Sequence, residues 1–208
     1  TEQVDEYYYL TLMNENYAHP DMPEGAAEGI IKGMYLLKDA GKPKKGELRV
    51  QLLGSGTILR EAIAAADLLD KDFGVTADIW SCPSFTELQR DGFDAERWNR
   101  LNPEAKAYVT QLLEGRQGPA IAATDYVRAF ADQIRAFVPM RYTVLGTDGF
   151  GRSDTRANLR RHFEVDRYYI AQAAVDALAK EGKMTGKDVA RAIKLYKIDA
   201  EKGNPVGV

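Results

Sequence analysis

Short apolar runs alternate with longer amphipathic segments along this sequence. Glycine, proline or polar residues bound each run, which is the pattern of β-strands separated by turns and helices. We therefore predict five strands. They are Tyr7–Met13, Leu48–Leu53, Val75–Cys82, Ala120–Ala123 and Tyr142–Leu145.

Apolar residues at helical spacing predict helices between these strands. The first helix begins at Pro23, whose missing N–H suits a helix start, and its apolar face covers Ala26–Leu37. A second apolar face covers Leu59–Leu69. The residues Thr86–Gln89 match a capping box, so we place a third helix start near Glu87.

Helical spacing continues in the second half of the chain. Thr124 or Asp125 is expected to cap a helix that carries Tyr126 and Phe130. The remaining helices are predicted at Pro103–Leu113, Thr155–Phe163, Asp166–Lys180 and Thr185–Tyr196.

The alternation of strands and helices predicts an α/β fold. The connections are long enough for crossovers, so the sheet is expected to be mostly parallel with helices on both faces. Tyr7–Met13 precedes the alternation and is therefore the expected odd strand. Without a repeat or an internal linker, residues 1–208 form one domain: a strand and inter-domain connection over 1–23, an α/β body over 24–201, and a frayed tail over 202–208.

Composition excludes some classes of partner. The 31 acidic and 28 basic residues give a net charge of −3, which offers no basic face for nucleic acid. No apolar run approaches the roughly 20 residues that span a bilayer, so no membrane is expected. The single cysteine fits a reducing compartment. The chain begins at Thr1 without a signal peptide, and we interpret it as a piece excised from a larger enzyme.

Several isolated features are weak evidence of chemistry. Gly54-Ser55-Gly56 follows a strand as a dinucleotide fingerprint would, but Leu59 stands where the third glycine belongs, so we interpret it as a tight turn. His19 and His162 lack metal-ligand spacing, although His19 lies in a polar loop where functional residues are common. Cys82 has no basic neighbours and is interpreted as a packing residue.

The glycine-rich stretch Gly146–Asp154 is the clearest local feature. It follows a predicted strand, so Thr147, Asp148, Ser153 and Asp154 are expected at the carboxyl edge of the sheet, where ligands dock. Either Ser153 or Asp154 is expected to cap the next helix.

Three arginines follow this stretch at intervals of four residues. Arg152, Arg156 and Arg160 form a cationic stripe suited to an anion or to a partner's carboxylates. The alternative is a solvated charged face with local pairs to Asp154 and Glu164.

Four longer segments are informative together. They are NENYAHPDMPEGAAEGI (Asn14–Ile30), VQLLGSGTILREA (Val50–Ala62), SFTELQRDGFDAERWN (Ser84–Asn99) and VLGTDGFGRSDTRANLRRHFEVD (Val144–Asp166). These segments closely resemble one family, the homodimeric bacterial pyruvate dehydrogenase decarboxylating component. The resemblance is to its C-terminal domain and covers nearly the whole chain.

This resemblance implies a transketolase-like, three-layer α/β/α domain with about five strands, one of them antiparallel. It implies a cytoplasmic, homodimeric parent enzyme that uses thiamine diphosphate and Mg²⁺ to decarboxylate pyruvate. That parent reductively acetylates the lipoyl group of its partner, dihydrolipoyl acetyltransferase.

In this family two preceding domains hold the cofactor, so the resemblance assigns no catalytic, cofactor or metal residue to this chain. The chain is then expected to bind no cofactor, to be inactive alone, and to support the other domains and a second copy. The connection that contains Asn14, Glu15, Asn16, Tyr17 and His19 is the part expected to approach the active-site side. The alternatives are a nucleotide-binding or oxidoreductase module around Gly54–Gly56 and an interaction module built on the arginine stripe.

Overall fold

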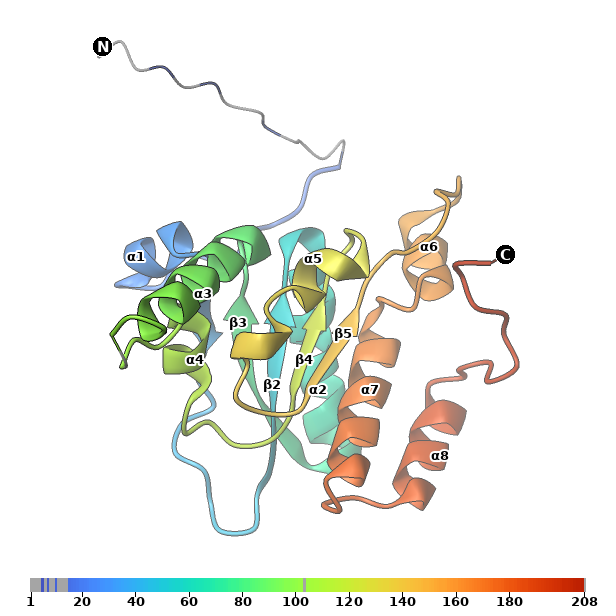
Figure 1. The fold of residues 1–208 in the computed structure, drawn as a ribbon. Coiled ribbons are helices and arrows are strands. Elements are labelled where there is room, and N and C mark those ends of the chain that lie inside the picture. The colour runs from blue at the N-terminus through green and yellow to red at the C-terminus, as the bar shows by residue number, and fades with distance from the viewer. Residues whose placement is uncertain (1–4, 6, 8–9, 11–14, 103, 208) are drawn as a thin grey trace.

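The fold is built on one five-stranded sheet (Figure 1). A computed structural model describes residues 5, 7, 10, 15–102 and 104–207. The strand order is β1-β3-β2-β4-β5, with parallel pairing between β2 and β3, β2 and β4, and β4 and β5, and antiparallel pairing between β1 and β3. The strands are β1 (Tyr35–Lys38), β2 (Leu48–Gly54), β3 (Val75–Ser81), β4 (Ala120–Ala123) and β5 (Tyr142–Leu145). This mixed sheet confirms the predicted fold class.

Helices cover both faces of the sheet and make a three-layer α/β/α domain. One face packs against α2 and α7, with α8 behind α7, and the other packs against α3, α4 and α5. The helices are α1 (Ala26–Ile31), α2 (Leu59–Phe73), α3 (Phe85–Asn99), α4 (Tyr108–Leu113), α5 (Arg128–Asp132), α6 (Arg156–His162), α7 (Arg167–Lys180) and α8 (Gly186–Leu195).

The central strand β2 is buried on both faces, as parallel strands between two helical layers must be. Val50 and Leu52 belong to the core beneath α2 and α7, whereas Leu53 belongs to the core beneath α3 and α4. Helix α7 is enclosed between the sheet and α8, and its many alanines permit a close approach to α2. The bounds of β2 to β5 match the predicted strands to within one residue.

The antiparallel strand is β1, which we predicted to be the end of a helix. Helix α1 ends at Ile31, and Gly33 adopts a φ of +92° that turns the chain. A Cβ atom at Gly33 would lie 2.4 Å from the carbonyl oxygen of Ser84, so the turn packs tightly against α3. Pairing with β3 outweighs the helical spacing of Tyr35–Lys38. The strand predicted at Tyr7–Met13 falls largely outside the described residues.

The predicted starts of α3 and α4 are wrong, because other residues satisfy the free N–H groups there. Helix α3 begins at Phe85, and its cap is Ser84, whose Oγ accepts a hydrogen bond of 3.1 Å from the Glu87 amide. Helix α4 begins at Tyr108, where the Asp91 carboxylate accepts from the backbone amide. The start predicted at Pro103 lies outside the described residues.

Neither Thr124 nor Asp125 caps α5. Val127 precedes that helix, and the amide of Arg128 donates to the Asp148 carboxylate at 2.8 Å. Thr124 instead accepts a hydrogen bond from the amide of Tyr126 at 3.2 Å. Helices α6, α7 and α8 confirm the later predictions.

The C-terminal tail, which we predicted to be frayed, lies against the glycine-rich stretch. Lys202 pairs with Glu164 at 3.0 Å. A Cβ atom at Gly149 would lie 2.9 Å from Cα of Val206, so the tail packs directly on this turn.

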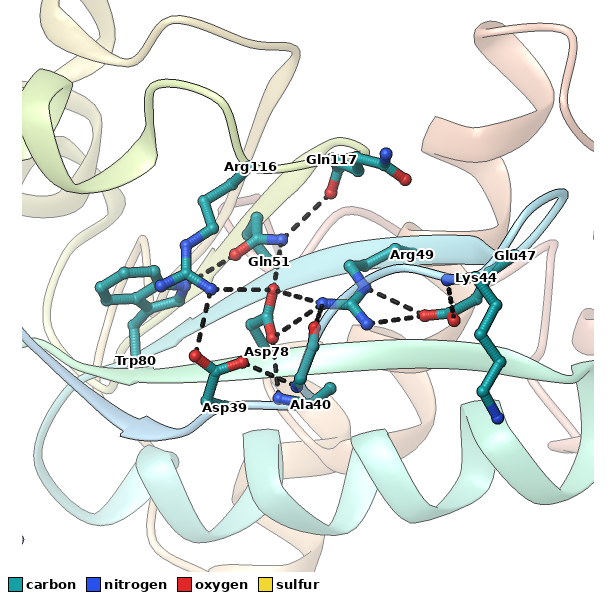
Figure 2. Close-up of polar contacts among 11 residues, drawn as sticks. Asp39, Ala40, Lys44, Glu47, Arg49, Gln51, Asp78, Trp80, Arg116 and Gln117 are labelled. Carbon is teal, nitrogen blue, oxygen red and sulfur yellow. Dashed lines mark hydrogen bonds and ion pairs between the residues drawn. The ribbon is translucent and has the colours of Figure 1, made fainter.

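A buried carboxylate ties two connections to the sheet (Figure 2). Asp78 of β3 is fully buried, and its side chain accepts hydrogen bonds of 2.9 Å from the Ala40 amide and from Nε2 of Gln51. Arg49 approaches the same carboxylate at 3.4 Å. An unpaired buried charge would cost several kcal/mol, and these donors offset that cost.

The network continues from Gln51 to the connection before β4. Its Nε2 also donates to the carbonyl of Gln117 at 3.0 Å, and its Oε1 accepts from the Trp80 indole at 2.8 Å. Arg116 lies over the Trp80 ring, 5.1 Å from its centroid (Figure 2). The connection is therefore held directly against β2.

Gly118 permits that close approach, and its replacement provides a test. Its φ is +82°, and a Cβ there would lie 1.7 Å from the Arg49 carbonyl oxygen. Gly118→Ala is expected to lower the free energy of unfolding by about 3 kcal/mol or more. Gly74→Ala is the matched control because its φ is +64° but its Cβ position is open; it should cost about 1 kcal/mol. Equal losses in urea unfolding would contradict the close approach.

Candidate functional site

The strand order reverses beside β2, and this creates a crevice at the carboxyl edge of the sheet. Strand β2 lies between β3 and β4. Helix α2, which follows β2, packs on one face of the sheet, and α5, which follows β4, packs on the opposite face. In open α/β sheets, ligands bind outside the carboxyl ends of the strands at such a reversal. Figure 1 shows α6 beside this edge at the top of the view.

A cavity of about 270 Å³ occupies this position. Thr57, Asp125 and Thr147 follow β2, β4 and β5 respectively and bring polar groups to it. The predicted arginine stripe lines the side of the cavity opposite these polar groups. The apolar part of the lining comes from α6 and from residues just before α2 and α7. The lining includes Ile58, Leu159, Phe163, Val165, Arg152, Arg156 and Arg160.

Hydrogen bonds fix the polar side of the cavity. The hydroxyl of Thr57 donates to Oδ2 of Asp125 at 3.2 Å. The hydroxyl of Thr147 donates to the carbonyl of Asp125, and its amide donates to the Tyr126 carbonyl at 2.9 Å. These contacts join the connections that follow three adjacent parallel strands.

Helix α6 is held beside the cavity by the buried carboxylate of Glu61. Arg167 donates to this carboxylate from its amide at 3.0 Å, from Nε at 2.9 Å and from Nη2 at 3.0 Å. Arg160 adds a bond of 3.2 Å from α6. Burial alone would raise the pKa of Glu61, but the hydrogen bonds and charges of the two arginines hold this pKa below its usual value.

The same arginines join α6 to the N-terminal connection. Arg160 donates to the Tyr17 hydroxyl at 3.2 Å, and Tyr17 donates to Glu15 at 3.0 Å. Arg156 forms an ion pair with Glu15. The Tyr17 hydroxyl and Arg156 lower the pKa of the Glu15 carboxyl. Two groups of candidate residues that the sequence identified separately therefore lie together.

The other candidates have separate places. Asn14 lies outside the described residues, while Asn16 and His19 are exposed. Asp148 pairs with Arg128 at 3.3 Å, so it holds α5 rather than the cavity. Arg152 is exposed and makes no ion pair with any residue that the structure describes.

The predicted cap of α6 is wrong by one or two residues. Thr155 is the cap and accepts from the Asn158 amide at 3.3 Å, whereas Ser153 is exposed outside the helix. Asp154 accepts from the Thr155 amide at 2.6 Å and from the Asn158 side chain at 2.9 Å. These two bonds lower the pKa of Asp154.

The turn Gly54-Ser55-Gly56 lacks the open space of a dinucleotide fingerprint. A Cβ atom at Gly54 would lie 2.6 Å from Cα of Leu59, so the helix start already fills the approach to the strand. Cys82 is fully buried, and this burial raises the pKa of its thiol far above the usual range. Among the described residues, no group of three or more His, Cys, Asp or Glu side chains could hold a metal ion.

Sequence reasoning missed Glu61 and Thr57. Glu61 lies four and eight residues before the buried Ala65 and Leu69, so helical spacing places it on the buried face of α2. A charged residue on such a face requires a partner. Thr57 gives no comparable signal, because its place at the cavity depends on the order of the strands.

Comparison with known proteins agrees with this architecture. The family described as "Transketolase-like TK C-terminal domain" matches residues 33–166. The chain belongs to this family. Two transketolase structures from Pichia stipitis share its fold, each with a TM-score of 0.52 and 18% identity, over 76% and 74% of this chain and 20% and 19% of theirs.

This transketolase-like domain is also similar to longer bacterial proteins, each named "Pyruvate dehydrogenase E1 component". It is 60% identical to that of Cupriavidus necator, over 100% of this chain and 23% of the relative. Identity is 58% with that of Pseudomonas aeruginosa, over 99% and 24%, and 53% with that of Escherichia coli K12, over 98% and 23%. The chain thus spans about a quarter of the length of these curated relatives.

Within the described part of the transketolase-like domain, no helix combines the length and the apolar character needed to cross a membrane.

Glu61→Gln should destabilise the domain in a pH-dependent way. At pH 7 the change removes the buried charge of Glu61 from its ion pairs with the partly exposed Arg160 and Arg167. We expect a loss of about 2 kcal/mol in the free energy of unfolding. Because the folded pKa of Glu61 is lowered, this contribution is present above the unfolded pKa of about 4.3 and disappears as the pH falls through the folded pKa. The gap between parent and variant should therefore close in strong acid.

Urea unfolding of both proteins from neutral pH to about pH 3 measures this gap. Glu114→Gln is the control, because Glu114 pairs with Lys106 on the surface and should cost less than about 1 kcal/mol. A gap that stays constant down to acid pH would show that the Glu61 charge does not stabilise the fold.

Proposed function

We propose that this chain is the C-terminal domain of a thiamine diphosphate-dependent pyruvate dehydrogenase of the acetyl-transferring type. The parent enzyme would decarboxylate pyruvate and reductively acetylate the lipoyl group of dihydrolipoyl acetyltransferase. The observation that carries this proposal is the 60% identity to a pyruvate dehydrogenase E1 component along the whole chain.

The lining of the cavity at the carboxyl edge does not suit thiamine diphosphate and Mg²⁺. A magnesium ion prefers several oxygen ligands, and Asp125 is the only carboxylate that lines the cavity at the carboxyl edge among the residues described. Elsewhere, the buried carboxylates of Glu61 and Asp78 are already occupied by arginines. We therefore propose that the cofactor and metal are held by other parts of the enzyme, and we assign no chemical step to this chain.

In this proposal the domain has a structural role. Its sheet and two cores form one packed unit, and the segment from Glu15 to Tyr17 is attached to that unit through Arg156 and Arg160. Such an attachment would fix how the domain is oriented toward the part of the enzyme that the connection reaches. The carboxyl edge is then the side that faces the active-site domains.

The proposal includes the assembly. The parent is a cytoplasmic bacterial homodimer in which this domain contacts other domains of the same enzyme and a second copy of the chain. The acetyltransferase is reached through the parent enzyme, and neither nucleic acid nor a membrane is a partner.

A domain exchange tests the proposal. In the Cupriavidus necator relative, the matching 210 residues would be replaced by this chain. We expect a dimeric chimera whose pyruvate decarboxylation, followed with thiamine diphosphate, Mg²⁺ and an artificial electron acceptor, lies within about tenfold of the unmodified enzyme. The 208-residue chain under the same conditions should show no turnover.

Two outcomes would contradict the proposal. A folded chimera without decarboxylation would show that the chain does not serve as this domain. Turnover by the isolated chain would show that it contains its own active site, against the structural role.

A further inference from the structure

We propose that the cavity at the carboxyl edge binds a small organic phosphate that carries hydroxyl groups. The proposal does not depend on the reaction of the parent enzyme. It rests on the place of the cavity in the sheet, on the arginines of one wall and on the hydroxyl and carboxylate groups of the other.

The topology puts the cavity where an α/β sheet opens for ligands. Thr57 follows β2, and Asp125 follows β4, the two neighbours between which the strand order reverses. The helices that follow these strands pack on opposite faces, so they diverge above the strand ends. Such a crevice is the usual ligand position in open α/β folds.

One wall can bind the phosphate. Arg152 lines the cavity without an ion pair to any described residue, so its guanidinium is available. Arg156 lines it four residues further on, at the start of α6, where it pairs with Glu15 and adds positive potential. Arg152 is the group that would hold the phosphate, because a guanidinium binds phosphate through two parallel hydrogen bonds. Arg160 stays with the buried Glu61 and contributes positive potential.

The opposite wall suits hydroxyl groups. The carboxylate of Asp125 would repel a phosphate but accepts hydrogen bonds from alcohols. Thr57 already donates to it at 3.2 Å, which fixes its orientation. A ligand with phosphate at one end and hydroxyls at the other therefore matches both walls.

The size of the cavity limits the ligand. A volume of about 270 Å³ lies below the range of about 300–1,000 Å³ that is typical of sites for drug-sized molecules. Leu59 also fills the close approach that a dinucleotide would need. The apolar lining from Leu159 and Phe163, which are both partly exposed, suits a short carbon chain between the two polar ends.

Titration of the isotope-labelled 208-residue chain, followed by amide NMR shifts, tests this proposal. The probes are glycerol 3-phosphate, propyl phosphate and glycerol. We expect saturable shifts near Thr57, Asp125 and Arg152 with glycerol 3-phosphate, with a dissociation constant of about 1 mM or below. Propyl phosphate, which lacks the hydroxyls, and glycerol, which lacks the phosphate, should each bind at least about fivefold more weakly.

Variants separate the two walls. Arg152→Ala should weaken glycerol 3-phosphate binding at least about fivefold. Arg141→Ala removes the same charge from an exposed site at the amino end of β5 and should leave binding unchanged. Asp125→Asn should weaken the binding of glycerol 3-phosphate but not that of propyl phosphate. The change replaces the carboxylate, which accepts hydrogen bonds from the hydroxyls and repels the phosphate.

The proposal is overturned by the absence of saturable shifts up to about 10 mM. Equal losses for Arg152→Ala and Arg141→Ala would overturn it as well, because binding would then reflect net charge alone. If Asp125→Asn fails to fold, the two phosphates are compared on the parent protein, and equal affinities would overturn the hydroxyl-bearing ligand class.

Discussion

The buried carboxylate of Glu61 joins segments that are far apart in the sequence. It lies in the first turn of α2, accepts three bonds from Arg167 at the start of α7, and binds Arg160 of α6. Through Arg160 it also reaches Tyr17 in the N-terminal connection. None of the seven residues of α6 is fully buried, so the position of this helix depends on polar contacts more than on the core. The position of the cavity wall that α6 forms therefore depends on these polar contacts.

The buried carboxylates of Asp78 and Glu61 stabilise different parts of the domain. Around Asp78, donors from β2 and from two connections surround one carboxylate and hold those connections against the sheet. Around Glu61, the bonds hold a short helix and a chain segment beside a cavity. Removing Asp78 would leave the buried Arg49 with Glu47 as its remaining carboxylate. Removing Glu61 would take the shared carboxylate from the partly exposed Arg160 and Arg167. Loss of one member of such a cluster is destabilising. The first cluster supports the fold, and the second supports the edge that we propose to be functional.

Sequence patterns predict the parts of this fold that depend on local burial. Strands β2 to β5 are short apolar runs, and the later helices have clear caps such as Asp166. Strand β1 was missed because Tyr35–Lys38 has helical spacing and its pairing depends on β3, about 40 residues later. Boundaries also shifted where a residue from another element satisfied a helix start, as Asp91 does for α4.

The candidate site was predictable in some of its members, but Glu61, Thr57 and the contacts were not. The arginine stripe was recognisable from residue types and the connection around Glu15 from the family resemblance, yet Tyr17 and Arg160 lie 143 residues apart. Glu61 is separated from Arg160 by 99 residues and from Arg167 by 106. No local pattern encodes such distances, and only the strand order brings these groups together.

Hydrogen exchange of α6 in Glu61→Gln tests most directly whether this carboxylate organises the carboxyl edge. The helix amides of Leu159 and Phe163 donate to the carbonyls of Thr155 and Leu159 at 2.9 Å in both cases. Our account predicts that these amides lose protection in the variant by more than the amides of β2, whose burial does not involve Glu61. Protection of α6 that changes no more than that of β2 would contradict it.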